Sequence, residues 1–410
     1  PLLIFNSLLF TIGSYFLSKL ILENPVHQAI FIFLFGILPP SIKISILGME
    51  YGILFFLEMA LLYFGFKQNK IWAQILFPIL ILFTRIDTVI FLGIVFLVDI
   101  IWNKKIRWFY ILGGMLGVAV LMGFNWFYFG ELVNNTIVAK SVTYAKNMSL
   151  ALQWKYFLMN YGNFWGMLKL PGDFNPFTIL VLVFEFLAFL YIVSKRESKN
   201  LFIWMIFLFG WTKQLIFISQ RSYFDWYYWV PQILLFAVIL VFVLEQKTYK
   251  FWWISLLLIF YILPMAAFQT VHSIATGNGE WNYRRSIGLF LKDYEKDKNQ
   301  YILLEPAGYI PYFSGLKAID EVGLVDKEIQ AEIKKDKANY WKNTVEKRKP
   351  KYLLAPKNLF EGKDGSFYQE NYRLLKEFRI KNHLNSDNKI LEKIYRLKPS
   401  GTDYNLYERK

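Results

Sequence analysis

Long apolar runs follow one another through the first two-thirds of this sequence, and they constrain its fold more than any other feature. A bilayer core about 30 Å thick is crossed by roughly 20 apolar helical residues. Because hydrocarbon offers no hydrogen-bonding partners, each run has to satisfy its own backbone groups, as a helix does. We therefore expect apolar helices near residues 2–22, 26–40, 50–66, 71–84, 88–102, 108–129, 176–193, 201–219, 229–244 and 251–268.

The composition favours a membrane protein and excludes several kinds of site. The 410 residues are 55% hydrophobic and include 40 Phe, 26 Tyr and 14 Trp, more aromatic side chains than a soluble domain of this length carries. The absence of Cys excludes disulfides, thiolate metal sites and Cys nucleophiles. The three His residues, at 27, 272 and 383, are too scattered for a His-rich metal centre. We assign no metal and no cofactor from the sequence, and leave open whether a divalent metal takes part.

The positive charges, which give a formal net charge of +15, gather in short loops between the apolar runs. Basic loops beside membrane helices face the cytoplasm, and this rule accounts for their positions better than contacts with nucleic acid do. We expect no nucleic-acid partner. The cytoplasmic clusters are Lys67 with Lys70, Lys104 with Lys105 and Arg107, Lys195 with Arg196 and Lys199, and Lys247 with Lys250.

These clusters set a topology. Two of them flank residues 71–102, so this stretch must leave and re-enter the same side of the membrane. Its two apolar pieces are short for full spans, which predicts a bent pair of half-helices with Thr84–Asp87 at the turn. If each later apolar run crosses the membrane once, the loop 130–175 and everything after residue 268 lie outside. The same count places Pro1 outside, and we expect a helix and an external loop upstream of it.

The tail differs in character from the membrane part. Charge density rises after residue 270, and Tyr301–Glu305 and Tyr352–Ala355 have the pattern of buried strands. Arg284–Tyr294 and Lys327–Trp341 have the pattern of helices. The tail is therefore predicted to be a small α/β domain.

Together these features predict an α-helical polytopic membrane protein with a small C-terminal α/β extracytoplasmic domain. The transmembrane domain covers 1–269 and includes the external loop 130–175. The soluble domain covers 270–410.

The predicted topology brings polar residues of the membrane domain to its external surface. Arg85 either pairs with Asp87 or binds a phosphate through its guanidinium fork. Glu50 either caps its own helix or contacts substrate. Asp225, among aromatic residues, belongs either to an interfacial belt or to a sugar site. Lys140 and Arg221 serve either as interface anchors or as phosphate ligands.

Two further charges lie deeper in the predicted helices. Glu185 and Lys213 fall on neighbouring spans, each about 10 Å below the external face at 1.5 Å per residue. We expect them to form a structural ion pair, the alternative being part of a proton path.

The order of several short motifs resembles one group of GT-C glycosyltransferases, similar to the terminal arabinofuranosyltransferases of mycobacterial cell walls. The membrane motifs are Gly48-Met49-Glu50, Thr84-Arg85-Ile86-Asp87, and Tyr128 to Thr136 followed by Ala139-Lys140. Ile86 and Asn134 stand where the group usually has Pro, so the sugar stays open. In the tail, the resemblance extends over Gly308 to Gly315, Ile319-Asp320 and Gly323 to Asp326.

The resemblance implies transfer of a sugar from a polyprenyl-phosphate carrier to an external glycan or lipid acceptor, at a bacterial plasma membrane and with the C-terminal domain outside. The catalytic base of the group lies in the first external loop, which is expected upstream of Pro1. The implied donor-phosphate ligands are Arg85, Lys140 and Arg221, and the implied substrate-site residues are Glu50, Asp87, Asn135 and Asp225.

Other functions remain as alternatives. A transporter or flippase for lipid-linked glycans would move its substrate without turnover. A ligase would use the same carrier and differ in the size of its product. A non-catalytic membrane scaffold would bind a partner through its tail.

Overall fold

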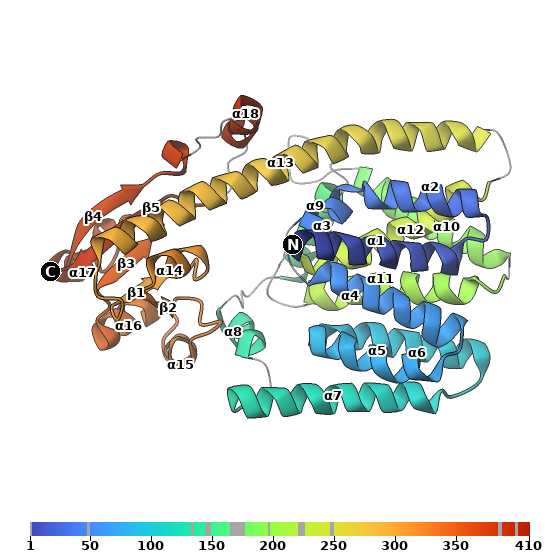
Figure 1. The fold of residues 1–410 in the computed structure, drawn as a ribbon, viewed down its shortest axis with the longest axis horizontal. Helices are drawn as coiled ribbons and strands as arrows, with labels where there is room; N and C mark the ends of the chain where they lie inside the picture. Colours follow the sequence, from blue (N-terminus) through green and yellow to red (C-terminus); the bar gives the residue numbers. More distant parts are fainter. Residues whose placement is uncertain are drawn as a thin grey trace. The chain divides into compact units, whose positions relative to one another are not determined.

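The computed structural model describes most of the chain, in two compact units (Figure 1). The helical unit comprises Pro1–Leu132 and Asn147–Thr270, and the sheet unit comprises Val133–Lys146 and Val271–Lys410. The described residues are 2–46, 50–132, 135–143, 149–164, 177–195, 197–219, 226–246, 250–383, 388–397 and 401–410.

The helical unit is built from apolar helices. Five helical segments of the described chain are long and apolar enough to cross a membrane, which is the pattern of a multi-pass membrane protein: Leu3–Ile21, Ile86–Asn103, Trp108–Phe129, Asn200–Ile218 and Trp226–Leu244. The elements are α1 (Leu2–Ile21), α2 (Pro25–Gly36), α3 (Pro39–Ile46), α4 (Tyr51–Ala60), the π-helical η1 (Leu61–Lys67), α5 (Ile71–Thr84), the 3₁₀ turn η2 (Ile86–Thr88), α6 (Val89–Asn103), α7 (Trp108–Phe129), α9 (Leu150–Phe164), α10 (Phe177–Ser194), α11 (Asn200–Ser219), α12 (Trp226–Leu244) and the first part of α13 (Lys250–Tyr294).

One expected span is broken. The run near 26–40 folds as α2 and α3, which meet at a bend of 73°. Pro39 and Pro40 begin α3 and cannot donate the backbone hydrogen bonds that would continue α2.

The stretch 71–102 forms a hairpin of two helices rather than a pair of half-helices. Both ends of the hairpin return to one end of the unit, because Arg107 beyond α6 donates to Asn69 before α5. The two ends of the hairpin thus lie together, as the predicted return to one side of the membrane requires. The half-helix prediction is wrong for the second arm, since Ile86–Asn103 is long enough to span by itself.

Two glycines let α7 pack closely against α5. A Cβ on Gly113 would lie 2.5 Å from the Gln74 carbonyl oxygen, and one on Gly117 would lie 3.1 Å from the Ile79 Cα. Their four-residue spacing is the small-xxx-small pattern that brings membrane helices together. Gly114, beside them, lies on another face of α7, where a Cβ would meet no atom within 4 Å.

The sheet unit contains a five-stranded mixed sheet with the order β2-β1-β3-β5-β4. β1 is parallel to β2 and β3, whereas β5 is antiparallel to β3 and β4. The strands are β1 (Tyr301–Leu304), β2 (Lys317–Asp320), β3 (Tyr352–Ala355), β4 (Tyr372–Phe378) and β5 (Tyr404–Arg409). The predicted strands at 301–305 and 352–355 are confirmed as β1 and β3.

Helices supply an apolar core on each face of this sheet. Leu304 packs in one cluster with Ile287 of α13, whereas Leu303 packs in the other with Ile329 and Val345. This alternation follows from the two-residue period of a strand. The helical elements are the second part of α13, α8 (Asn135–Thr143), α14 (Tyr309–Ser314), α15 (Lys327–Lys335), α16 (Tyr340–Arg348), η3 (Leu359–Glu361), α17 (Gly365–Asn371), η4 (Ile380–His383) and α18 (Lys389–Leu397).

Two sequence assignments change in the sheet unit. The single helix expected over Lys327–Trp341 is broken into α15 and α16, because Asp336 accepts the backbone N–H groups of Ala338 and Asn339 at 3.1 and 3.2 Å. α8, assigned from the sequence to a loop of the membrane domain, packs instead in the sheet unit, where Thr143 donates to the Val322 carbonyl at 2.9 Å.

Candidate functional site

A cluster of charged side chains lies in the helical unit where three helical segments begin or end. Arg85 directly follows α5, Asp87 lies in η2, and Glu50 directly precedes α4. The backbone at Arg85 is extended, with φ −155° and ψ 126°. Its N–H still bonds the Ile81 carbonyl at 3.0 Å, so the chain leaves α5 without losing that hydrogen bond.

Arg85 is the centre of this cluster. Its Nε donates to Oδ1 of Asp87 at 2.8 Å, and its Nη1 donates to Glu50. The guanidinium carbon lies 5.0 Å from the ring centre of Tyr51 and 5.2 Å from that of Tyr227. Two carboxylates and two rings therefore fix the plane of a side chain that is 14% exposed.

Lys213 of α11 joins the cluster through Asp87. Its Nζ lies 3.1 Å from Oδ2 of Asp87, so Asp87 bridges the two cations. The Lys213 side chain is only 2% exposed, and its ammonium lies 5.6 Å from the ring centre of Phe209. A buried ammonium needs such a partner, because taking it out of water unpaired costs several kcal/mol.

The expected Glu185–Lys213 ion pair is wrong. Glu185 of α10 is fully buried and accepts a hydrogen bond from the hydroxyl of Tyr161 on α9. Lys213 instead pairs with Asp87. The two residues do lie on neighbouring helices, but they belong to different polar contacts.

Glu58, near the end of α4, was not singled out from the sequence. It is fully buried, and neither carboxylate oxygen has a hydrogen-bond partner in the described part of the chain. It interacts electrostatically with Lys213, Asp87 and Arg85. A lone carboxylate inside an apolar run is the signal that points to it, because intramembrane acids are rare and are retained for function.

The cluster combines two cations with three carboxyl groups, and its members differ in access to solvent. Glu50 is the most exposed, at 35%, followed by Asp87 at 18% and Arg85 at 14%, whereas Lys213 and Glu58 are buried. The open end of the cluster is therefore at Glu50, which accepts a hydrogen bond from Nη1 of Arg85.

One nitrogen of the Arg85 guanidinium, Nη2, is left without a hydrogen bond to any described residue. Nε and Nη1 make the hydrogen bonds described above, and Nη2 donates to no acceptor in the described part of the chain. Nη2 is not one of the buried side-chain atoms that lack a hydrogen-bond partner. Chemically, this donor is suited to an anionic oxygen, such as that of a phosphate, arriving from the open end.

The other residues predicted for the site are not brought to Arg85 by any described contact. Lys140 and Asn135 belong to α8 of the sheet unit, where Lys140 is partly buried and makes contacts of its own. Arg221 and Asp225 lie outside the described residues. The structure thus brings together Arg85, Asp87 and Glu50 and adds Lys213 to them.

The described residues contain no group of three or more His, Cys, Asp or Glu side chains that could hold a metal ion. Glu50 and Asp87 are held by Arg85, so their oxygens already have a cation.

Comparison with known proteins gives one match. Residues 272–407, nearly the whole C-terminal part of the sheet unit, match a family described as a domain of unknown function (DUF8728). No curated protein and no solved structure matches the chain.

Proposed function

We propose that the chain is a membrane-embedded glycosyltransferase that takes a sugar from a polyprenyl-phosphate carrier and transfers it to a glycan or lipid acceptor. We place it in a bacterial plasma membrane, with the Arg85 cluster and the sheet unit on the external side. The proposal rests on the motif order in the sequence and on the geometry of Arg85.

The observation that carries the proposal is the unused Nη2 of Arg85. A guanidinium held by Glu50 and Asp87 between two rings is preorganised, so an arriving phosphate does not have to order it. Preorganised donors act where charge develops in the reaction. Here that charge develops on the phosphate oxygens as the carrier departs.

In the proposed reaction, an acceptor hydroxyl oxygen bonds to the anomeric carbon while the bond from that carbon to the phosphate oxygen breaks. The polyprenyl phosphate leaves with the bonding pair, and the hydroxyl proton passes to a carboxylate base. Arg85 binds the leaving phosphate. Glu50, the most exposed carboxylate of the cluster, would contact a sugar hydroxyl, and its 35% exposure supports this role.

A transporter of lipid-linked glycans is the second candidate, favoured by the buried Lys213 and Glu58. Proteoliposomes that contain the full-length protein and a fluorescent polyprenyl-phosphate sugar, with acceptor glycan outside, separate the two functions. A transferase releases polyprenyl phosphate and gives a heavier acceptor, and Arg85→Ala abolishes both products. Movement of intact donor between leaflets without product would establish the transporter and overturn the transferase.

A further inference from the structure

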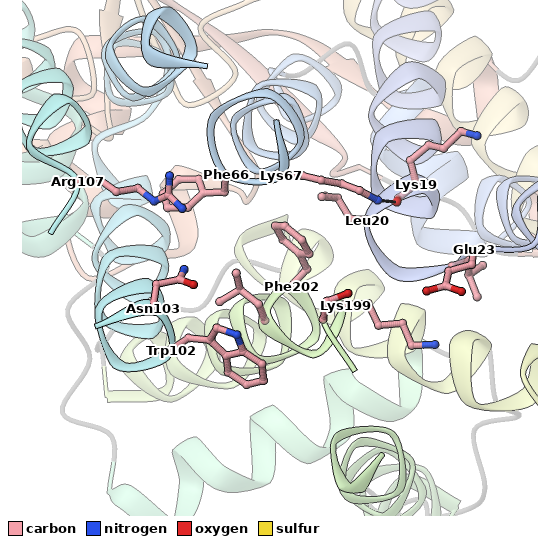
Figure 2. Close-up of a pocket in the computed structure, with 13 residues that line it drawn as sticks. Lys19, Leu20, Glu23, Phe66, Lys67, Trp102, Asn103, Arg107, Lys199 and Phe202 are labelled. Atoms are coloured by element: carbon pink, nitrogen blue, oxygen red, sulfur yellow. Dashed lines mark hydrogen bonds between the residues drawn. The ribbon is translucent and has the colours of Figure 1, made fainter. Parts of the chain in front are cut away.

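A pocket of about 310 Å³ lies at the end of the helical unit away from the Arg85 cluster (Figure 2). It forms between the ends of α1, η1 and α6 and the start of α11. Lys67 closes η1 and is separated from Glu50 by the whole of α4, whose 10 residues alone span about 15 Å at 1.5 Å per residue. The pocket and the Arg85 cluster are therefore separate sites.

Four cations line this pocket, and three of them come from the basic clusters that the topology places on the cytoplasmic side. Figure 2 shows Arg107 on one side of the pocket and Lys67 and Lys19 across from it. Lys199, from the start of α11, is the fourth. The positive end of the α11 dipole adds to their field.

Two of these cations are already neutralised within the protein. Arg107 Nε lies 2.8 Å from Oδ2 of Asp99, and Lys199 pairs with Glu197 at 2.7 Å and with Glu245. They hold the walls of the pocket in place.

The other two, Lys19 and Lys67, have no carboxylate within ion-pair distance in the described part of the chain. Lys67 donates to the backbone carbonyl of Lys19, and the Lys19 ammonium lies 5.5 Å from the ring centre of Tyr15. These two ammonium groups bring two positive charges to one corner of the pocket, against the single carboxylate of Glu23, which interacts electrostatically with Lys67. Glu23, also in the lining, is the acid that an incoming anion would face.

Apolar groups complete the pocket. Leu20, Phe66 and Phe202 are buried in its walls, whereas Trp102 is 42% exposed. A tryptophan beside cations at the end of apolar helices is typical of the membrane interface. A pocket of about 310 Å³ fits a head group but leaves acyl chains outside.

We propose that this pocket binds the phosphate of an anionic lipid head group, through Lys19 and Lys67. A phosphate ester supplies the charge that these two lysines lack, and its glycerol and acyl parts suit the aromatic wall and the lipid outside. Basic pockets between membrane helices bind lipid head groups in this manner. Free phosphate shares the charge but gains nothing from the apolar wall.

The test uses native mass spectrometry to measure how much lipid the full chain retains after purification in detergent. The probes are short-chain phosphatidylglycerol, phosphatidylcholine and inorganic phosphate. The test variant is Lys19→Gln with Lys67→Gln. The matched control is Lys104→Gln with Lys105→Gln, which removes the same charge from exposed residues outside the pocket.

The proposal predicts that phosphatidylglycerol binds in preference to phosphatidylcholine and that the test variant binds it roughly 30-fold more weakly. The control should stay within about 3-fold of wild type, since charges farther from the ligand contribute less. Lys19→Arg with Lys67→Arg, which checks folding, should restore binding, and Glu23→Gln should tighten it. Equal loss in the test and control variants, or displacement of the lipid by inorganic phosphate at millimolar concentration, would overturn the lipid-phosphate assignment.

Discussion

The Lys213 ammonium lies 3.1 Å from Oδ2 of Asp87, and this contact connects a buried lysine of α11 to the turn between α5 and α6. Asp87 holds Arg85 through its other oxygen at 2.8 Å. A substitution at Lys213 should therefore alter the position of the Arg85 side chain, even though Lys213 is too buried to contact a large substrate itself.

We predict that Lys213→Met destabilises the helical unit by about 2 kcal/mol. Breaking a buried ion pair costs about 3–5 kcal/mol, and the loss is smaller here because Asp87 keeps Arg85. Combining it with Asp87→Asn should recover part of the loss, which gives a coupling energy between the two sites. Thermal unfolding in detergent measures all three variants, with Lys105→Met as the exposed control. Zero coupling would show that the contact contributes no stability.

Glu50→Gln should tighten binding of polyprenyl phosphate and slow sugar transfer. Glu50 accepts from Nη1 of Arg85, so its carboxylate competes with an arriving phosphate for the guanidinium. Removing that negative charge strengthens the attraction between Arg85 and the phosphate. Titration of the lipid against the variant, together with the transfer assay on the same preparation, separates the two effects. Weaker binding in Glu50→Gln would mean that the positioning of Arg85 by Glu50 outweighs the competition of its carboxylate with the phosphate.

Gly113→Ala should loosen the packing of α7 on α5. The added Cβ would lie 2.5 Å from a backbone carbonyl oxygen that cannot rotate away, and overpacking of this kind costs about 1–3 kcal/mol. Gly114→Ala adds the same atom where nothing lies within 4 Å, so it should change stability by less than about 0.5 kcal/mol. Unfolding of the two variants in detergent makes the comparison, and equal stabilities would contradict the close contact.

Glu295 should make the sheet unit sensitive to acid. Burial acts to raise the pKa of its carboxyl group, but Lys351 at 2.5 Å, the Asp297 N–H at 2.8 Å and the Tyr352 hydroxyl at 2.8 Å together lower it below its usual value. A depressed pKa stabilises the folded state above the unfolded value of about 4.3, and that contribution is lost as the pH falls through the folded pKa.

Hydrogen exchange of β1 and β3 in the full chain measures this effect. Between pH 7 and pH 3, the protection of these strands in the wild type should fall. In Glu295→Gln the free energy of opening should already be lower at pH 7, by about 1–3 kcal/mol, because the partners of Glu295 lose their acceptor. Protection in this variant should also depend less on pH. Parallel pH curves for the two proteins would contradict the assignment.

Much of the helical unit follows from its sequence, because a run such as 108–129 has few ways to satisfy its backbone in lipid. The return of residues 71–102 to one side follows from the basic residues at each end. The break between α2 and α3 and the contact of α7 with α5 were not predicted, although Pro39 with Pro40 and the spacing of Gly113 and Gly117 are the sequence signals for them.

The partners within the site were harder to predict. The pairing of Asp87 with Arg85 was one of the two interpretations of that motif, since the residues are two apart. Lys213 lies 126 positions beyond Asp87 in the sequence, and only the packing of α11 on α6 brings them together. From their similar depth on neighbouring spans, Glu185 and Lys213 looked suited to pair with each other. Depth in a helix, however, does not fix the direction in which a side chain points.

Binding of a short polyprenyl phosphate to the purified chain, compared between wild type and Arg85→Lys, tests the central claim most directly. Lysine keeps the charge but loses the planar fork, so we predict binding at least about 10-fold weaker, equivalent to 1.4 kcal/mol. Lys19→Gln with Lys67→Gln, at the other end of the helices, should lose at most the binding at the lipid-phosphate pocket and keep the binding that depends on Arg85. Equal binding by wild type and Arg85→Lys, or loss confined to the Lys19 and Lys67 variant, would contradict a donor-phosphate site at Arg85.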